Sequence, residues 1–248
     1  MSSAADRAHG LAPAPNRRER ARAAMLEEIK QTALELMREQ GTPDVRFSDI
    51  ARAMGLTAPA LYRYYANRDE LLTDMIVDAF DDLSAHLAEA AAGVPADDLG
   101  ARLFATSSAY RRWASSESLR FALIFGQPVP GYAAPDLGPT TEAAGRAMAN
   151  LSQAVTVATE RGQLSDPLQR EVGEAFAAAT AEKRGGLHDA IAPATFQAML
   201  HSWAALHGFT CLEAYGHLQW LSPQARDELF AAQVRLSAVC AGLPPPPA

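Results

Sequence analysis

Residues 47–72, FSDIARAMGLTAPALYRYYANRDELL, predict two short helices joined by a tight turn and followed by the start of a long third helix. Ser48 can cap the first helix, because its hydroxyl accepts from the free amides of an opening turn. Gly55 is the residue at which the chain turns, since glycine adopts a positive φ without steric cost. Asn67 and Glu70 have the spacing of a capping box for the third helix. These local signals restrict the stretch to a small helical unit.

The second short helix is expected over Thr57–Tyr65. Pro59 is compatible with it, because the amides of a first helical turn have no partner within the helix. Leu61 and Tyr65 lie four residues apart and are expected to pack inward, which leaves Tyr62–Tyr64 available to other molecules. Two short helices around a glycine turn are typical of a helix-turn-helix, whose second helix enters the major groove of DNA. The alternative is an ordinary glycine turn between two amphipathic helices.

The net charge of −7 does not favour DNA binding, but the charge is divided unevenly. Residues 1–68 contain 11 Lys or Arg and 8 Asp or Glu, which leaves +3. Residues 69–248 contain 11 and 21, which leaves −10. The basic part therefore coincides with the helix-turn-helix, where phosphate groups would be met.

The residue types around the turn indicate which side chains would meet DNA. Hydroxyl and guanidinium groups bind phosphate, and a guanidinium can also read base edges. Phosphate contacts are expected from Ser48, Thr57, Tyr62, Tyr64 and Arg68. Base reading is expected from Arg63, with methyl contacts to thymine from Ala58 and Ala60. For Arg68 the alternative is an exposed cation without a role. Phosphate or minor-groove contact and a solvated helix start both remain open for Arg17, Arg18, Arg20 and Arg22.

A longer pattern extends over residues 18–72. Its members are Ile29, Ala33, Leu36, Gly41, Phe47, Ser48, Ile50, Ala51, Gly55, Leu56, Leu61, Tyr62, Tyr64, Tyr65, Arg68, Glu70 and Leu71. With these residues the segment resembles the N-terminal domain of TetR/AcrR-type transcriptional repressors. The resemblance implies a homodimer in which the helix that opens at Asn67 couples ligand binding to the spacing of the two DNA-reading helices.

The remainder of the chain predicts an all-α fold, because alanine is abundant and strand-forming clusters are scarce. The expected helices cover residues 18–40, 67–91, 97–115, 117–125, 140–161, 168–181, 193–215 and 223–241. Loops are expected at 126–132 and 182–191. The expected domains are a disordered arm at 1–16, a DNA-binding domain at 17–72, a helical ligand-binding and dimerisation domain at 73–241, and a frayed tail at 242–248.

The two C-terminal helices indicate how a dimer would form. The helix at 193–215 is apolar nearly all round, so it must be covered on more than one side. Together with 223–241 it can form a four-helix bundle with the same pair from a second copy, and an intramolecular core is the alternative. Trp203, His207 and Gly208 resemble the signature of a TetR subgroup named for Trp, His and Gly. Tyr110–Trp113 and Leu123–Tyr132 fit the same subgroup.

Aromatic and soft side chains on several helices are candidates for a pocket that takes a small, mostly apolar molecule. They are Phe104, Tyr110, Trp113, Phe121, Phe125, Met148, Phe176, Trp203 and His207. The alternative for each of them is ordinary core packing. His207 can orient a ligand or satisfy a buried carbonyl, and for Cys211 an inert thiol is favoured over a sensor of oxidants.

Other classes of protein find no support in the sequence. It has no nucleophile elbow, metalloprotease helix, phosphate-binding glycine loop or dinucleotide fingerprint, so we expect neither an enzyme nor a cofactor. Cys211 and Cys240 form no metal-ligand cluster, and two distant cysteines fit a reducing cytoplasm. No apolar run has the length of a membrane span, and no signal peptide is expected.

These observations favour a homodimeric, ligand-responsive transcriptional regulator that binds a palindromic DNA operator. A repressor released by an unidentified small molecule is the first interpretation. A transcriptional activator of the same fold, or a small-molecule-binding protein without a DNA function, is the alternative.

Overall fold

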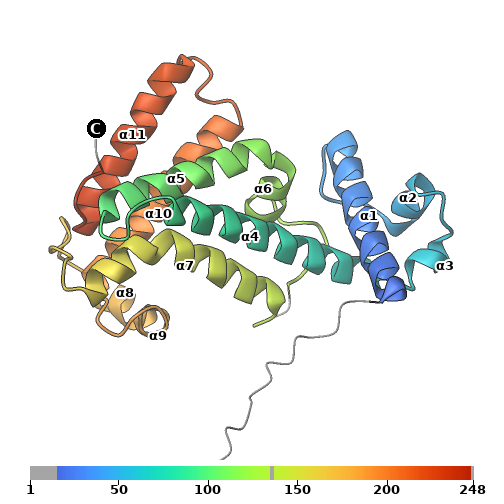
Figure 1. The fold of residues 1–248 in the computed structure, drawn as a ribbon, viewed down its shortest axis with the longest axis horizontal. Helices are drawn as coiled ribbons and strands as arrows, with labels where there is room; N and C mark the ends of the chain where they lie inside the picture. Colours follow the sequence, from blue (N-terminus) through green and yellow to red (C-terminus); the bar gives the residue numbers. More distant parts are fainter. Residues whose placement is uncertain (1–15, 135–136, 247–248) are drawn as a thin grey trace, which may run out of the picture. The chain divides into compact units, whose positions relative to one another are not determined.

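A computed structural model describes residues 16–134 and 137–246, and these residues contain helices and no strands (Figure 1). The prediction of an all-α fold is thereby confirmed. The chain divides into two compact units, Met1–Leu71 and Leu72–Ala248. Residues 1–15, which make up most of the expected arm, lie outside the described residues. Asn16, the last residue of that expected arm, instead caps the first helix.

The first unit contains α1 (Arg17–Gln40), α2 (Phe47–Ala53) and α3 (Ala58–Leu61). The Asn16 side chain accepts from the amides of Arg18 and Glu19, and the Glu19 carboxylate reaches back to the Asn16 amide at 2.8 Å. At its other end α1 stops at Gly41, whose φ of 65° is the left-handed conformation expected of a C-terminal cap. The buried residues that join the three helices include Ile29, Ala33, Ile50, Ala51, Leu61 and Tyr65.

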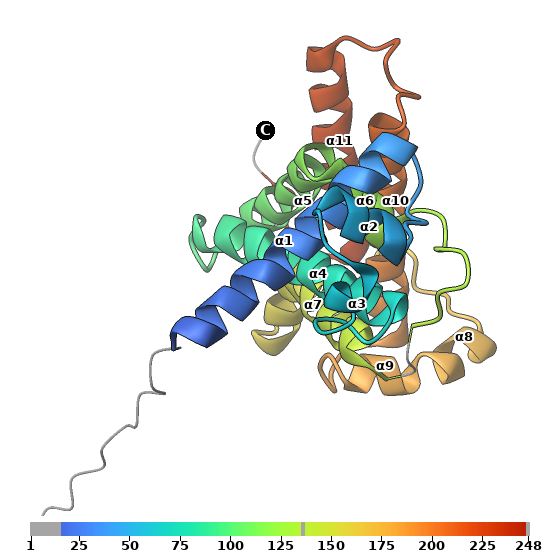
Figure 2. The same ribbon diagram turned by 90° about the vertical axis from the view of Figure 1, so that its right-hand side faces the viewer.

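The second unit is built around α4, α5 and α7, which lie side by side in Figures 1 and 2. Its helices are α4 (Arg68–Ala92, whose first turn belongs to the first unit), α5 (Leu99–Ser116), α6 (Ser118–Phe125), α7 (Pro139–Glu160), α8 (Glu174–Ala179), α9 (Ala181–Gly185), α10 (Pro193–Ala214) and α11 (Pro223–Ala241). Helix α5 contacts α6, α7, α10 and α11, so it is central to this unit. Helices α10 and α11 pack against each other and are joined by the loop 215–222.

The prediction of one helix over residues 168–181 was wrong. Residues 168–173 are irregular, and only the short helices α8 and α9 follow, with α9 lying in the expected loop. Backbone hydrogen bonds connect the stretch before this segment to the end of α11. The Ser165 amide donates to the Gly242 carbonyl at 2.9 Å, and the Leu168 amide donates to the Cys240 carbonyl at 3.1 Å. These two bonds hold residues 165–168 beside the end of α11.

The prediction of a frayed tail at 242–248 was also wrong, as far as residues 242–246 are concerned. Gly242 closes α11 with a φ of 80°, and Leu243 is buried. The backbone then passes so close to α5 that a Cβ on Gly100 would lie 2.8 Å from the carbonyl oxygen of Pro244. Four consecutive prolines indicated a tail, but an extended proline segment can also pack against a small residue. Residues 247–248 lie outside the described part.

Candidate nucleic-acid interface and aromatic cluster

The turn between α2 and α3 has the geometry expected of a helix-turn-helix. Gly55 has a φ of 66°, and the Leu56 amide closes the turn on the carbonyl of Ala51 at 2.8 Å. The cap expected from Ser48 was wrong, because α2 begins one residue earlier, at the buried Phe47, and has no side-chain cap. Ser48 is therefore an exposed residue of the first turn.

Helix α3 is shorter than the expected helix. Thr57 occupies the N-cap position with extended backbone, but its hydroxyl makes no capping hydrogen bond. Regular helix covers Ala58–Leu61, and Tyr62–Tyr64 continue as turns. The amides of Tyr62 and Arg63 donate to the carbonyls of Ala58 and Ala60 at 3.3 and 3.4 Å, and the Tyr64 amide donates to the Leu61 carbonyl at 2.9 Å. The chain still follows a helical path to Tyr65, whose amide reaches the Leu61 carbonyl at 3.3 Å.

The side chains after α3 are fixed by contacts with α1 and α2. The Tyr62 ring lies 5.2 Å from the ring of Phe47, yet 54 % of Tyr62 remains exposed. The guanidinium of Arg22 lies 5.4 Å from the centre of the Tyr64 ring and donates to the Arg63 carbonyl at 3.3 Å. Arg22 therefore anchors the end of α3. The sequence placed it in a basic cluster but gave no signal of this link across 41 positions.

Arg68 is engaged within the first unit. Its Nη2 lies 2.6 Å from a carboxylate oxygen of Asp44, and its Nε donates to the Val45 carbonyl at 3.1 Å. The guanidinium therefore ties the first turn of α4 to the loop before α2, and it is not an idle exposed cation. Nearby, Asn67 caps α4 by accepting from the Glu70 amide at 2.8 Å, and the Glu70 carboxylate accepts from the Ala66 amide. The expected cap is present, but its return bond goes to residue 66 instead of 67.

None of the side chains expected to meet DNA is buried. Exposed residues are Ser48, Thr57, Ala58, Tyr62 and Arg63, and half-buried residues are Ala60, Tyr64 and Arg68. Leu61 and Tyr65, by contrast, pack inward as expected. The first unit thus presents two tyrosines and one arginine beside a short helix whose apolar side is fully used in packing.

In the second unit, five of the nine expected pocket residues form one aromatic cluster. Its members are Tyr110 on α5, Phe121 and Phe125 on α6, and Trp203 and His207 on α10. Trp203 and His207 are stacked with ring centres 5.0 Å apart and an interplanar angle of 19°. Tyr110 contacts the rings of all four others.

The aromatic cluster contains one chain of polar contacts, which runs from the buried Tyr110 to the half-buried His207 and Cys211. The Tyr110 hydroxyl lies 2.8 Å from Nδ1 of His207, and Nε2 of His207 lies 3.4 Å from Sγ of Cys211. Burial, with a smaller contribution from Cys211, raises the pKa of Tyr110, and burial lowers the pKa of His207. Burial also raises the pKa of the Cys211 thiol, which disfavours the reactive thiolate. Burial therefore favours the uncharged forms of Tyr110, His207 and Cys211.

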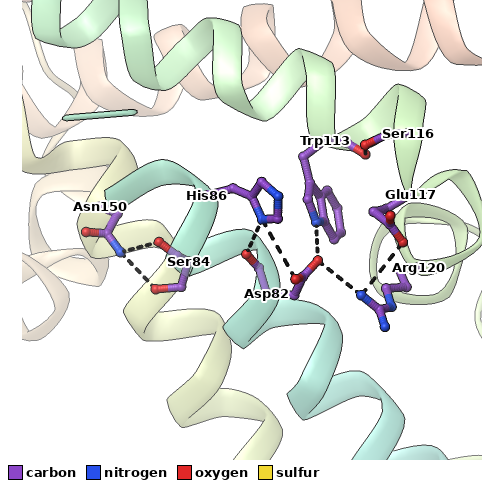
Figure 3. A network of polar contacts seen from close by, with 8 residues as sticks. All are labelled: Asp82, Ser84, His86, Trp113, Ser116, Glu117, Arg120 and Asn150. Carbon is purple, nitrogen blue, oxygen red and sulfur yellow. Dashed lines mark hydrogen bonds and ion pairs between the residues drawn. The ribbon is translucent and has the colours of Figure 1, made fainter. Parts of the chain in front are cut away.

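Trp113 does not join the aromatic cluster but a polar network on α4 (Figure 3). Its Nε1 donates to the Asp82 carboxylate at 2.7 Å, and Arg120 of α6 lies 3.1 Å from the same oxygen. Asn150 of α7 binds the hydroxyl of Ser84 at 2.8 Å. Helix α4 is thus held by polar contacts from α5, α6 and α7 within one stretch of its length.

The three remaining candidates lie elsewhere in the second unit. Phe104 pairs with Phe230 of α11 at 6.3 Å between ring centres. Met148 on α7 and Phe176 on α8 are half-buried, and in the described residues no ring contact joins Phe176 to the aromatic cluster. The sequence identified the aromatic residues but could not show which of them meet.

Two protein-family profiles match the chain. One, described as "Bacterial regulatory proteins, tetR family", matches residues 29–75. The other, described as "Tetracyclin repressor-like, C-terminal domain", matches residues 103–236, more than half of the chain. The chain belongs to the TetR family. The match to the C-terminal profile does not test the Trp-His-Gly subgroup, which stays a prediction.

Individual relatives agree with this assignment. The chain is 40% identical over 113 residues to the HTH-type transcriptional regulator Rv1816 of Mycobacterium tuberculosis, a match that covers 44% of this chain and 48% of that protein. The match thus spans about half the length of the curated relatives. The solved structure of regulatory protein SCO4313 is 33% identical, has a TM-score of 0.69, and is matched over 90% of this chain and 98% of its own.

A more distant structure, RolR in complex with resorcinol, has a TM-score of 0.50 at 15% identity and covers 92% of this chain and 98% of its own. At that identity it shows the fold alone. The matched family and the mycobacterial relatives are described as regulators, which supports a non-enzymatic role at the level of the family. Within the described residues, no helix has both the length and the apolar character that crossing a membrane requires.

Proposed function

We propose that this TetR-family chain is a homodimeric transcriptional regulator that binds a palindromic operator and is released from it by a small molecule. The observation that carries the DNA-binding part is the exposed Tyr62–Arg63 pair at the end of α3, on a unit whose turn and apolar packing are those of a helix-turn-helix. Net positive charge in residues 1–68 supports approach to phosphate.

The proposed contacts separate into positioning and reading. Ser48, Thr57, Tyr62 and Tyr64 would anchor phosphates, while Arg63, with Ala58 and Ala60 beside it, would read base edges. Arg68 would contribute mainly by holding the loop before α2 in position. Its Nε donates to the Val45 carbonyl, and its Nη2 pairs with the Asp44 carboxylate.

The dimer would form through α10 and α11. Large apolar side chains are exposed on these helices and at the C-cap of α10, namely Leu200, Leu212, Tyr215, Leu229, Leu236 and Val239. Large apolar side chains left exposed on a pair of packed helices favour a protein interface, and the same pair from a second copy would complete a four-helix bundle. Two DNA-reading helices would then meet two half-sites about one helical turn apart.

Release by a ligand would use the aromatic cluster and α4. Tyr110 in the cluster and Trp113 lie one turn apart on α5, and Trp113 is hydrogen-bonded to Asp82 of α4. A ligand that rearranges the rings around Tyr110 would therefore act on α4, whose first turn belongs to the DNA-binding unit. The ligand shifts the balance only by its different affinity for the two arrangements of α4. RolR with resorcinol supports the idea that this fold accommodates a small aromatic molecule.

The test of DNA binding is a selection of genomic fragments on the purified protein, followed by fluorescence anisotropy with a selected fragment across a salt series. Tight binding that weakens steeply with salt is expected, because counterions are released from phosphate. Arg63→Ala should remove the preference for that fragment. Arg38→Ala is the matched control, since Arg38 is an exposed arginine at the end of α1 in the same unit.

Equal affinity for random DNA in the wild-type protein, or an equal effect of the two substitutions, would contradict the proposal. A reporter with the selected fragment in its promoter then separates repression from activation, since the two give opposite changes when the gene for this chain is deleted.

A further inference from the structure

The segment that carries the proposed base-reading residue is only partly helical. Helix α3 ends at Leu61, and Arg63 lies in the turns that lead from there to Tyr65. The last carbonyls of a helix have no partner within the helix. An arginine discriminates between bases by two aligned hydrogen bonds to one base edge, so its backbone has to be held in place. The orientation of Arg63 therefore depends on contacts from outside α3.

Arg22 of α1 supplies two such contacts. Its Nη1 donates to the Arg63 carbonyl at 3.3 Å, and its guanidinium lies 5.4 Å from the centre of the Tyr64 ring. A positive charge is favourable at this place, because the carbonyl end of a helical segment carries partial negative charge. One planar group thus holds the backbone of the reading residue and the side chain that follows it.

The place of Arg22 on α1 accounts for this reach. Ile29 lies two helical turns further along on the same side of α1, and it is fully buried in the first unit. Arg22 therefore continues the side of α1 that packs into the unit, beyond its last fully buried residue. The ring of Tyr62 is held in turn by Phe47 of α2, at 5.2 Å between ring centres. The reading segment is thus linked to both α1 and α2.

We propose that Arg22 is a positioning residue for base recognition by Arg63. It acts through the Arg63 backbone and the Tyr64 ring, and it sets the direction in which the Arg63 side chain leaves the unit. This inference rests on the proposed function, because it gives Arg22 a part in the same DNA-reading site. It differs from a phosphate contact, in which the charge of Arg22 would act on every DNA sequence alike.

The test measures base preference by fluorescence anisotropy on variants of the selected fragment. The base pair read by Arg63 is the one whose preference Arg63→Ala removes. Arg22→Gln should lower the preference at that pair about two- to fivefold, the range of an exposed contact between an arginine and an aromatic ring. In the Arg63→Ala background the same change should have no further effect at that pair, because the residue through which it acts is gone.

Arg18→Gln is the matched control. Arg18 is an exposed arginine four residues before Arg22, on the same side of α1 and about 6 Å nearer its start. Both substitutions remove one positive charge, but only Arg22→Gln should lower the base preference. An equal loss of affinity for every base, with a salt slope reduced by about 0.9, would make Arg22 a phosphate contact and overturn the proposal.

Hydrogen–deuterium exchange of the full-length protein tests the positioning without DNA. Arg22→Gln should raise the exchange rate of the amides of residues 62–65 about two- to fivefold, whereas Arg18→Gln leaves it unchanged and neither alters exchange in α2. Unchanged exchange of residues 62–65 in Arg22→Gln, or a loss of preference that persists without Arg63, overturns the proposal. A wild-type protein that prefers no base would refute the proposed function, and the exchange result alone would then decide whether Arg22 holds residues 62–65.

Discussion

Asp82→Ala is expected to destabilise the second unit more than is usual for a substitution at a half-exposed position. One oxygen of the Asp82 carboxylate accepts from the buried indole of Trp113 at 2.7 Å and lies 3.1 Å from Nη1 of Arg120 (Figure 3). The substitution removes the acceptor of the indole N–H of Trp113, a residue that is 1 % exposed, and it breaks the link between α4, α5 and α6. Asp81→Ala is the matched control, since the neighbouring Asp81 pairs with Arg146 where both side chains are about half exposed.

The expected loss of unfolding free energy follows from the surroundings of Asp82 and Asp81. A buried donor left without its partner costs roughly 1–3 kcal/mol, and a partly exposed ion pair adds at most about 1 kcal/mol. Asp82→Ala should therefore lower the free energy of unfolding by about 1–4 kcal/mol. Asp81→Ala loses only an exposed pair and should cost under about 1 kcal/mol. Asp82→Asn retains a carbonyl oxygen for the indole and should lie between the two.

Urea unfolding followed by circular dichroism measures these free energies by linear extrapolation. The protein concentration is held constant, because a dimer unfolds in a concentration-dependent way. The same pair of substitutions is then measured in a Trp113→Phe background, where the donor is absent. The reasoning is refuted if Asp82→Ala costs no more than Asp81→Ala, or if its cost is undiminished without the indole.

Three further predictions concern backbone strain, pH and assembly. Gly55→Ala should cost about 1 kcal/mol in urea unfolding because its φ of 66° strains any residue with a Cβ, whereas Gly208→Ala, inside α10 with open space around it, should stabilise by up to about 1 kcal/mol; equal effects would contradict the strain argument. Burial lowers the pKa of His207 in the folded protein, so the unfolded chain takes up the proton first and stability is lost as the pH falls below about 6.5; His207→Gln should flatten this part of the stability profile, and an unchanged slope would remove His207 as its cause. Leu236→Glu places a charge on the exposed apolar face of α11 and should shift the proposed dimer towards the monomer in sedimentation velocity, and an unchanged sedimentation coefficient would contradict a dimer formed through this face.

A feature could be predicted from the sequence where the interacting residues lie close together along the chain. Gly41, Gly55 and the Asn67 cap act within four residues, and each has the conformation or the bond that its local sequence indicates. The contacts Arg22–Arg63 and Arg68–Asp44 connect positions 41 and 24 apart, and no local pattern encodes them. The same limit applies to residues 165–168, whose hydrogen bonds to the end of α11 join segments far apart in the sequence.

The candidate site shows this limit most clearly on α5. Tyr110 and Trp113 are three residues apart and share a helical face, and as aromatic side chains both were expected to line one pocket. Their neighbours separate them: Tyr110 meets the stacked rings of Trp203 and His207, while Trp113 turns its N–H to a carboxylate on α4. This division makes a regulatory role physically reasonable, because a single helix carries both the contact with the aromatic cluster and the contact with α4. A movement of α5 cannot alter one contact without acting on the other, so the aromatic cluster and α4 are expected to respond together.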